Sequence, residues 1–146
     1  MQATVDTNVI ASWWETRPEA NVILVTGRVF DVLDLPVPAG SAALEQMQAA
    51  GVAVGPVAVV GQERMLFFVM TRGSPADEDE WWSCGLDSEP ESVVVGLRWH
   101  CRDSYVPAPP SRDASGQAAR WLRSPQEHPL PDALRLLEYL VDACEA

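Results

Sequence analysis

The chain has 146 residues, 47% of them hydrophobic, and a formal net charge of −11. This size and composition exclude a disordered chain and predict one globular domain over residues 1–146. The charge disfavours general nucleic-acid binding, which depends on neutralising phosphates with basic residues. Residues 1–6 lack the basic and apolar parts of a secretion signal, no apolar run is long enough to span a bilayer, and the three cysteines are widely spaced. We therefore expect a cytoplasmic protein without disulfides and without a membrane partner.

The charges are unevenly distributed along the chain. Residues 77–91 contain seven acids and no base, whereas residues 98–123 contain five arginines against two acids. A segregated charge of this kind leaves room for a local anion-binding surface in an otherwise acidic protein.

In the N-terminal half, the pattern predicts a short helix that begins at Thr7 and ends before Pro18. Apolar runs and turn residues then predict strands, a helix that Gly51 ends, and a hairpin around residues 61–63. The expected strands cover residues 21–25, 28–35, 57–60 and 65–70, and the helix covers residues 41–50.

In the C-terminal half, residues 73–90 are predicted to form a long acidic loop. Further strands are expected over residues 93–100, 105–108 and 118–122, with a loop at 109–117. A helix over residues 131–145 carries one apolar face, formed by Leu134, Leu137, Val141 and Cys144. The order of elements predicts an α/β (α+β) domain whose mixed sheet is flanked by an N-terminal, a middle and a C-terminal helix.

Four segments, in this order, resemble the N-terminal domain of bifunctional DNA primase/polymerases, in the archaeo-eukaryotic primase superfamily. The resemblance covers residues 7–123, and parts of the chain also resemble a short actinobacterial branch of this family. The segments are residues 14–22 (WETRPEANV) followed by 26–28 (TGR), 30–36 (FDVLDLP), 61–68 (GQERMLFF) and 103–111 (DSYVPAPPS).

The resemblance implies template-directed nucleotidyl transfer with two divalent ions, which clamp the attacking and leaving oxygens. The family pattern places two acids at i and i+2 of one strand, a third acid on a neighbouring strand, and a histidine that contacts phosphates. Only Asp34 remains here, because the i+2 position is Pro36, the histidine aligns with Met65, and the third acid aligns near Arg98. Asp31 is three residues from Asp34, so a regular strand points it to the other face.

These replacements predict a catalytically inactive domain without a cofactor, in which Asp34 is a remnant acid. We expect Asp34 to pair with Arg98 where metals would otherwise bind; the alternative is an acid that ends a strand at a turn. Guanidinium groups suit phosphates, so a ligand-binding set is also expected, with a solvated surface as the alternative. This set consists of Arg98, Arg102, Ser111 and Arg112.

Two further motifs concern partners and metals. Trp81 and Trp82 follow four consecutive acids, and an exposed aromatic with an acidic rim suits a protein partner. Cys84, His100 and Cys101 could suggest zinc, but adjacent strand residues point apart and no Cys-x-x-Cys pair exists. We therefore expect no metal site.

The first functional hypothesis is a domain that binds a protein, a nucleotide or a nucleic-acid end, with a protein favoured by the acidic charge. The alternative is a nucleotidyltransferase that uses Mg²⁺ or Mn²⁺ on a rearranged set of Asp31, Asp34 and Asp103. A third hypothesis is an interaction module whose cleft is filled by Met65, Arg98 and the C-terminal helix.

Overall fold

The computed structural model describes residues 6, 8, 12, 23–27, 29–71, 91–94, 96–100, 104–112 and 116–145. These residues form an α+β fold with two antiparallel sheets and two described helices, which confirms the expected class. Most of the helix predicted after Thr7 and all of the acidic loop predicted at 73–90 lie outside the described residues.

The larger sheet has six strands in the order β5-β6-β2-β4-β3-β8. Every pairing between its strands is antiparallel, so the expected mixed sheet is corrected in this respect. The reason is that β4 lies between β2 and β3, which would otherwise form a parallel pair across the helix that connects them. The strands are β2 (Phe30–Pro36), β3 (Val57–Val60), β4 (Arg64–Met70), β5 (Glu91–Val94), β6 (Leu97–His100) and β8 (Ala119–Arg123).

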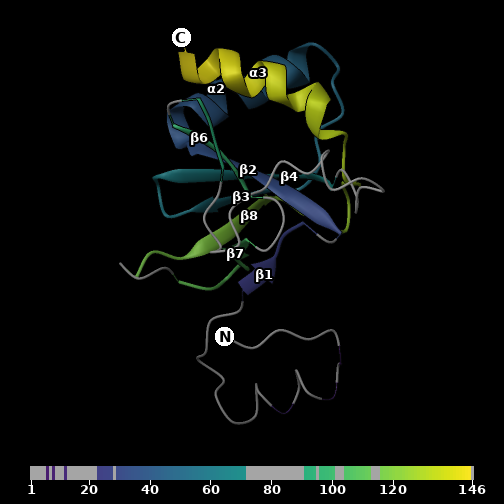
Figure 1. Ribbon diagram of the computed structural model, residues 1–146, viewed down its shortest axis with the longest axis vertical. Coiled ribbons are helices and arrows are strands. Elements are labelled where there is room, and N and C mark those ends of the chain that lie inside the picture. Colours follow the sequence, from purple (N-terminus) through teal and green to yellow (C-terminus); the bar gives the residue numbers. More distant parts are fainter. Residues whose placement is uncertain are drawn as a thin grey trace.

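The remaining elements cover the two faces of this sheet. The helices α2 (Val37–Ala49) and α3 (Ala133–Glu145) lie together on one side, and the two-stranded sheet of β1 (Ile23–Val25) and β7 (Tyr105–Pro107) lies on the other (Figure 1). No helix among the described residues is long and apolar enough to cross a membrane.

Alternation along the strands gives each face its own core. One face, here called the helix face, packs residues such as Leu33, Leu35 and Phe67 against the helices. The opposite face, here called the Asp34 face, carries Asp34 among apolar neighbours that pack toward β1 and β7. These neighbours include Val32, Leu66, Phe68, Leu24 and Val106.

Two boundaries differ from the sequence prediction. The strand predicted over residues 93–100 is two strands, β5 and β6, which pair with each other. Gly96 allows the reversal, because its φ of 91° is a conformation that residues with a side chain rarely adopt. The middle helix begins at Val37 instead of Ser41, since prolines are tolerated in a first helical turn.

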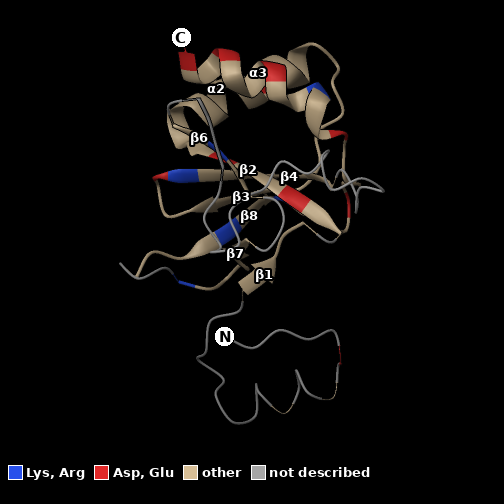
Figure 2. Ribbon diagram, viewed as in Figure 1, with Lys and Arg blue, Asp and Glu red and all other residues tan. Residues whose placement is uncertain are grey.

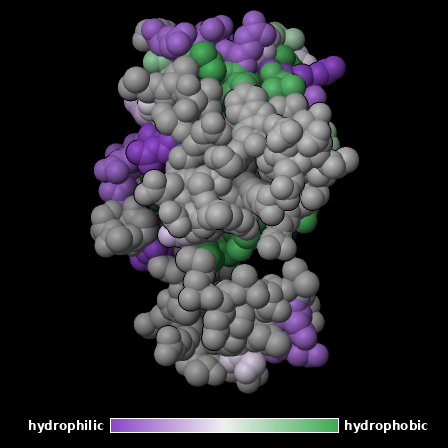
Figure 3. Space-filling view, in the orientation of Figure 1, coloured by the Kyte–Doolittle hydropathy of each residue, from purple (hydrophilic) through white to green (hydrophobic). Residues whose placement is uncertain are grey.

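The structure corrects one of the four residues predicted for the apolar face of the C-terminal helix. Leu137, Val141 and Cys144 are partly buried and pack against the core, as predicted. The buried residues of α3 are Ala133, Leu136 and Leu140, whereas Leu134 is 52% exposed. The small Ala133 therefore faces the core, whereas the larger Leu134 is directed outward. Acidic segments mark the outer side of α3 (Figure 2), and hydrophilic residues gather over this end of the molecule (Figure 3).

We expect Leu136→Ala to lower the free energy of unfolding by about 2–5 kcal/mol, because it leaves a cavity between α3 and the sheet. The matched control is Leu134→Ala on the same helix, which should change stability by no more than about 0.5 kcal/mol. Urea unfolding followed by circular dichroism measures both values. Equal losses in the two variants would contradict this orientation of α3.

Candidate functional site

Asp34 lies on the central strand β2 and is only 8% exposed. The strand register places it directly opposite Arg98 of β6 on one side and Leu66 of β4 on the other. A carboxylate this deeply buried is costly unless its oxygens are paired.

Both oxygens of the Asp34 carboxylate are engaged. Arg64 Nε donates to Oδ1 at 2.6 Å, and His100 Nε2 lies 3.0 Å from Oδ2. The expected ion pair with Arg98 is therefore wrong: Arg98 is exposed, and the two contacts come from residues diagonal to Asp34. The long Arg98 side chain carries its charge into water, where an ion pair contributes little, whereas the short His100 ring stays at the level of the sheet.

Arg64 is held by three oxygen atoms. Besides the carboxylate, its Nη2 donates to the main-chain oxygens of Asp34 and Gly96, at 3.0 and 3.1 Å. Arg64 pairs directly with Pro36 in the register between β2 and β4. The guanidinium therefore fills the part of the Asp34 face next to position 36.

His100 links Asp34 to a second polar residue. Its Nδ1 lies 2.8 Å from Ser104 Oγ. Both ring nitrogens of His100 are therefore within hydrogen-bonding distance of an oxygen atom, one of Asp34 and one of Ser104. A serine, a histidine and an aspartate in this order resemble the arrangement that activates a nucleophile, but Ser104 is only 1% exposed. The chain of contacts therefore holds the Asp34 carboxylate in place.

Asp31 lies on the helix face, as its spacing from Asp34 predicts. It accepts a hydrogen bond at 3.1 Å from Trp99 Nε1, and it is also buried. The two carboxylates thus point to opposite faces of the sheet. No group of three or more His, Cys, Asp or Glu residues within the described part of the chain could hold a metal ion, and Asp103 lies outside that part.

Met65, at the position aligned with the family histidine, also lies on the helix face. It is buried against Gly40 of α2, where an added Cβ would come within 2.7 Å of the Met65 sulfur. Met65 and the exposed Arg98 are therefore on different faces, so they do not fill one cleft together, as the third hypothesis requires.

The structure does not bring the described members of the expected ligand-binding set together. Arg98 is on β6, whereas Ser111 and Arg112 lead toward β8, with β2, β4 and β3 between these strands. Ser111 is buried, and its N–H donates to the Ala108 oxygen at 2.7 Å. The Arg112 guanidinium donates to the Gly116 oxygen at 2.8 Å.

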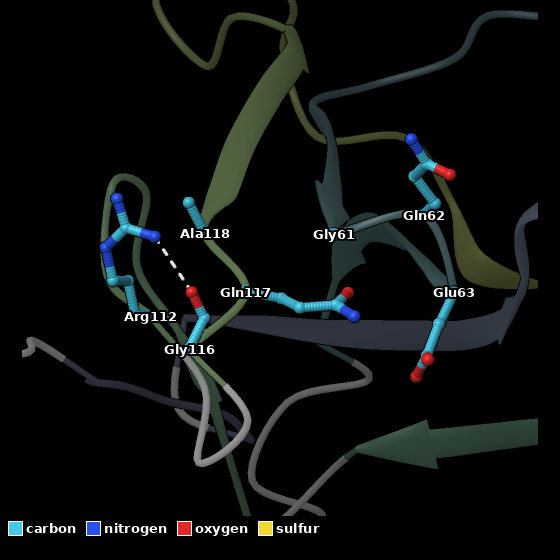
Figure 4. Close-up of a pocket in the computed structure, with 7 residues that line it drawn as sticks. All are labelled: Gly61, Gln62, Glu63, Arg112, Gly116, Gln117 and Ala118. Atoms are coloured by element: carbon cyan, nitrogen blue, oxygen red, sulfur yellow. Dashed lines mark hydrogen bonds between the residues drawn. The ribbon is translucent and has the colours of Figure 1, made fainter.

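A shallow surface depression lies beside Arg112, between the β3–β4 turn and the segment that enters β8. Figure 4 shows the Gln117 side chain pointing across it toward the turn, while Arg112 lies on the other side of the strand. Its lining combines polar side chains with glycine and alanine, and it does not include Asp34. The lining residues are Gly61, Gln62, Glu63, Arg112, Gly116, Gln117 and Ala118.

Other residues proposed from the sequence lie outside the described residues. These are Arg102, the partner-binding pair Trp81 and Trp82, and the two cysteines Cys84 and Cys101. Conversely, sequence reasoning missed Arg64 and His100 as partners of Asp34, and Ser104 as the partner of His100. The positions of Arg64 and His100 follow from the pairing of β2 with β4 and β6, which no local pattern specifies.

We predict that Asp34→Asn lowers the free energy of unfolding by about 1–3 kcal/mol, because it removes the charge that Arg64 and His100 share. Arg98→Ala, at the exposed position directly opposite, should change it by no more than about 0.5 kcal/mol. Thermal and urea unfolding of the two variants provide the comparison. If Arg98→Ala lost more unfolding free energy than Asp34→Asn, the result would instead support the ion pair between Asp34 and Arg98 that the sequence predicts.

Comparison with known proteins identifies the family of this chain. The model of the bifunctional DNA primase/polymerase N-terminal domain matches residues 1–133. No curated protein and no solved structure gives a significant match. The match includes every residue that contacts the Asp34 carboxylate and ends where α3 begins. The chain therefore belongs to the bifunctional DNA primase/polymerase N-terminal family.

Proposed function

We propose that this primase/polymerase-like domain does not catalyse nucleotidyl transfer and acts by binding a partner. The observation that carries the proposal is the state of Asp34, whose two carboxylate oxygens contact Arg64 and His100. An acid that is shared between a guanidinium and an imidazole has little capacity left for metal coordination.

The residues around Asp34 do not fit a pair of divalent ions. Such ions need several oxygen ligands around one space. Here position 36 is a proline, Arg98 stands opposite Asp34, and Asp31 points to the other face. The positive charges of Arg64 and Arg98 would repel a divalent ion that approaches from this side.

The alternative of a rearranged enzyme requires Asp31, Asp34 and Asp103 to converge. The separation of Asp31 and Asp34 by the thickness of the sheet argues against it. The hydrogen bond between Trp99 Nε1 and Asp31 reinforces this separation.

The partner is proposed from charge and composition. The net charge of −11 and the acidic segment that contains Trp81 and Trp82 favour a protein. A nucleotide or a nucleic-acid end is the second candidate. The exposed Arg98 on the Asp34 face supports this candidate, since a guanidinium binds phosphate oxygens in pairs.

We expect the protein to extend no primer on a single-stranded template, with either Mg²⁺ or Mn²⁺, beyond the background set by Asp34→Ala. Denaturing electrophoresis of a labelled primer measures extension directly. Synthesis by the wild type that Asp34→Ala abolishes would establish an active enzyme and refute the proposal.

Thermal melting distinguishes the two partner classes. A ligand present at about 100 times its dissociation constant adds about 2.7 kcal/mol to stability, which raises the melting temperature by several degrees. A rise with nucleoside triphosphates that needs no metal and disappears in Arg98→Ala would assign nucleotide binding. If nucleotides give no rise, the protein partner remains, and a Trp81→Ala, Trp82→Ala double variant should then lose that partner in a pull-down.

A further inference from the structure

We propose that the Arg64 guanidinium acts as a built-in substitute for a metal ion, filling an oxygen-lined position next to Asp34. The inference rests on the proposed loss of two-metal chemistry and adds what occupies the position instead. It concerns Arg64, a residue that the sequence did not single out.

The atoms that surround Arg64 are those that bind hard cations. Arg64 contacts one carboxylate oxygen, Oδ1 of Asp34, and two main-chain oxygens, those of Asp34 and Gly96, at distances between 2.6 and 3.1 Å. Carboxylate and carbonyl oxygens are also the ligands that Ca²⁺ takes, and carboxylates hold Mg²⁺. These three oxygen atoms, here called the oxygen cluster, thus offer negative charge and dipoles to one cation. The Arg64 guanidinium of the same chain is that cation.

The strand register explains why Arg64 reaches this position. A side chain at position 36 points to the same face as Asp34, two residues away, and Arg64 stands directly opposite it on β4. Pro36 offers no group that binds a cation. It also packs near Gly96, where an added Cβ would lie 3.5 Å from the proline ring. Pro36, Arg64 and Gly96 therefore close the space that a second carboxylate and its ion would need.

A tethered cation has a consequence that a bound metal does not have. Its local concentration is fixed by the fold, so the oxygen cluster is neutralised whatever the concentration of free metal. The wild-type protein should then show the same stability in EDTA and in millimolar Mn²⁺.

The decisive variant restores the acid and removes the arginine: Pro36→Asp combined with Arg64→Ala. Pro36 is the N-cap of α2, a position where aspartate is among the preferred residues, so the helix can still form. The matched control combines Pro36→Asp with Arg98→Ala, which has the same change in net charge but keeps Arg64. Electron paramagnetic resonance of free Mn²⁺ measures binding, and circular dichroism verifies the fold.

We expect the Pro36→Asp, Arg64→Ala protein to bind Mn²⁺ at least ten times more tightly than the wild type and the control. It should also melt at a higher temperature when Mn²⁺ is added. Equal Mn²⁺ affinity in all three folded proteins would overturn the proposal, as would wild-type binding that Asp34→Asn removes.

If the double variant does not fold, Arg64→Ala alone provides the test. We expect millimolar methylguanidinium to raise its melting temperature, with no rise in the wild type or in Arg64→Ala combined with Asp34→Asn. If methylguanidinium does not raise the melting temperature of Arg64→Ala, the proposal that the Arg64 guanidinium takes the place of a metal ion is refuted. These outcomes are independent of primer extension by the wild type, which tests the proposed function separately.

Discussion

The buried carboxylate of Asp34 constrains the arrangement of the three central strands. Placed on β2 with 8% of its surface exposed, it needs partners for both oxygens, and it takes one from each neighbouring strand. Arg64 on β4 and His100 on β6 each lie diagonal to it, so a shift in either register would leave a charge buried without a partner. Few alternative pairings of these strands satisfy that condition.

The same contacts support the proposal that this domain does not catalyse nucleotidyl transfer. Nucleotidyl transfer by two metals requires acids that share one open space, whereas here the acid on the Asp34 face is committed to the chain's own cation. Position 36 and position 64 are direct cross-strand neighbours. Pro36 offers no group that binds a metal, and Arg64 supplies the positive charge that the buried Asp34 carboxylate needs.

Sequence reasoning succeeded where the signal was local. The alternation of β2 placed Asp31 and Asp34 on opposite faces, and the turn at residues 61–63 separated two strands, as the structure shows. Sequence reasoning failed where the position of a residue depended on how its element packs in the tertiary structure. Leu134 was expected on the buried face of α3 because its spacing fits an apolar stripe, but the residues that α3 buries are Ala133, Leu136 and Leu140. Similarly, a glycine with positive φ divided one predicted strand into β5 and β6.

The sequence by itself determined the α+β class, the family, the presence of a proline two residues after Asp34 and the placement of Asp31 and Asp34 on different faces of the sheet. These follow from composition, motif order and the two-residue period of a strand. Only the tertiary structure decided what Asp34 contacts. Arg64 and His100 are 30 and 66 residues away along the chain, and the contacts depend on which strands flank β2 and in which register. Sheet order is a property of the whole core, so no local pattern could assign Arg64 as the cation of this site.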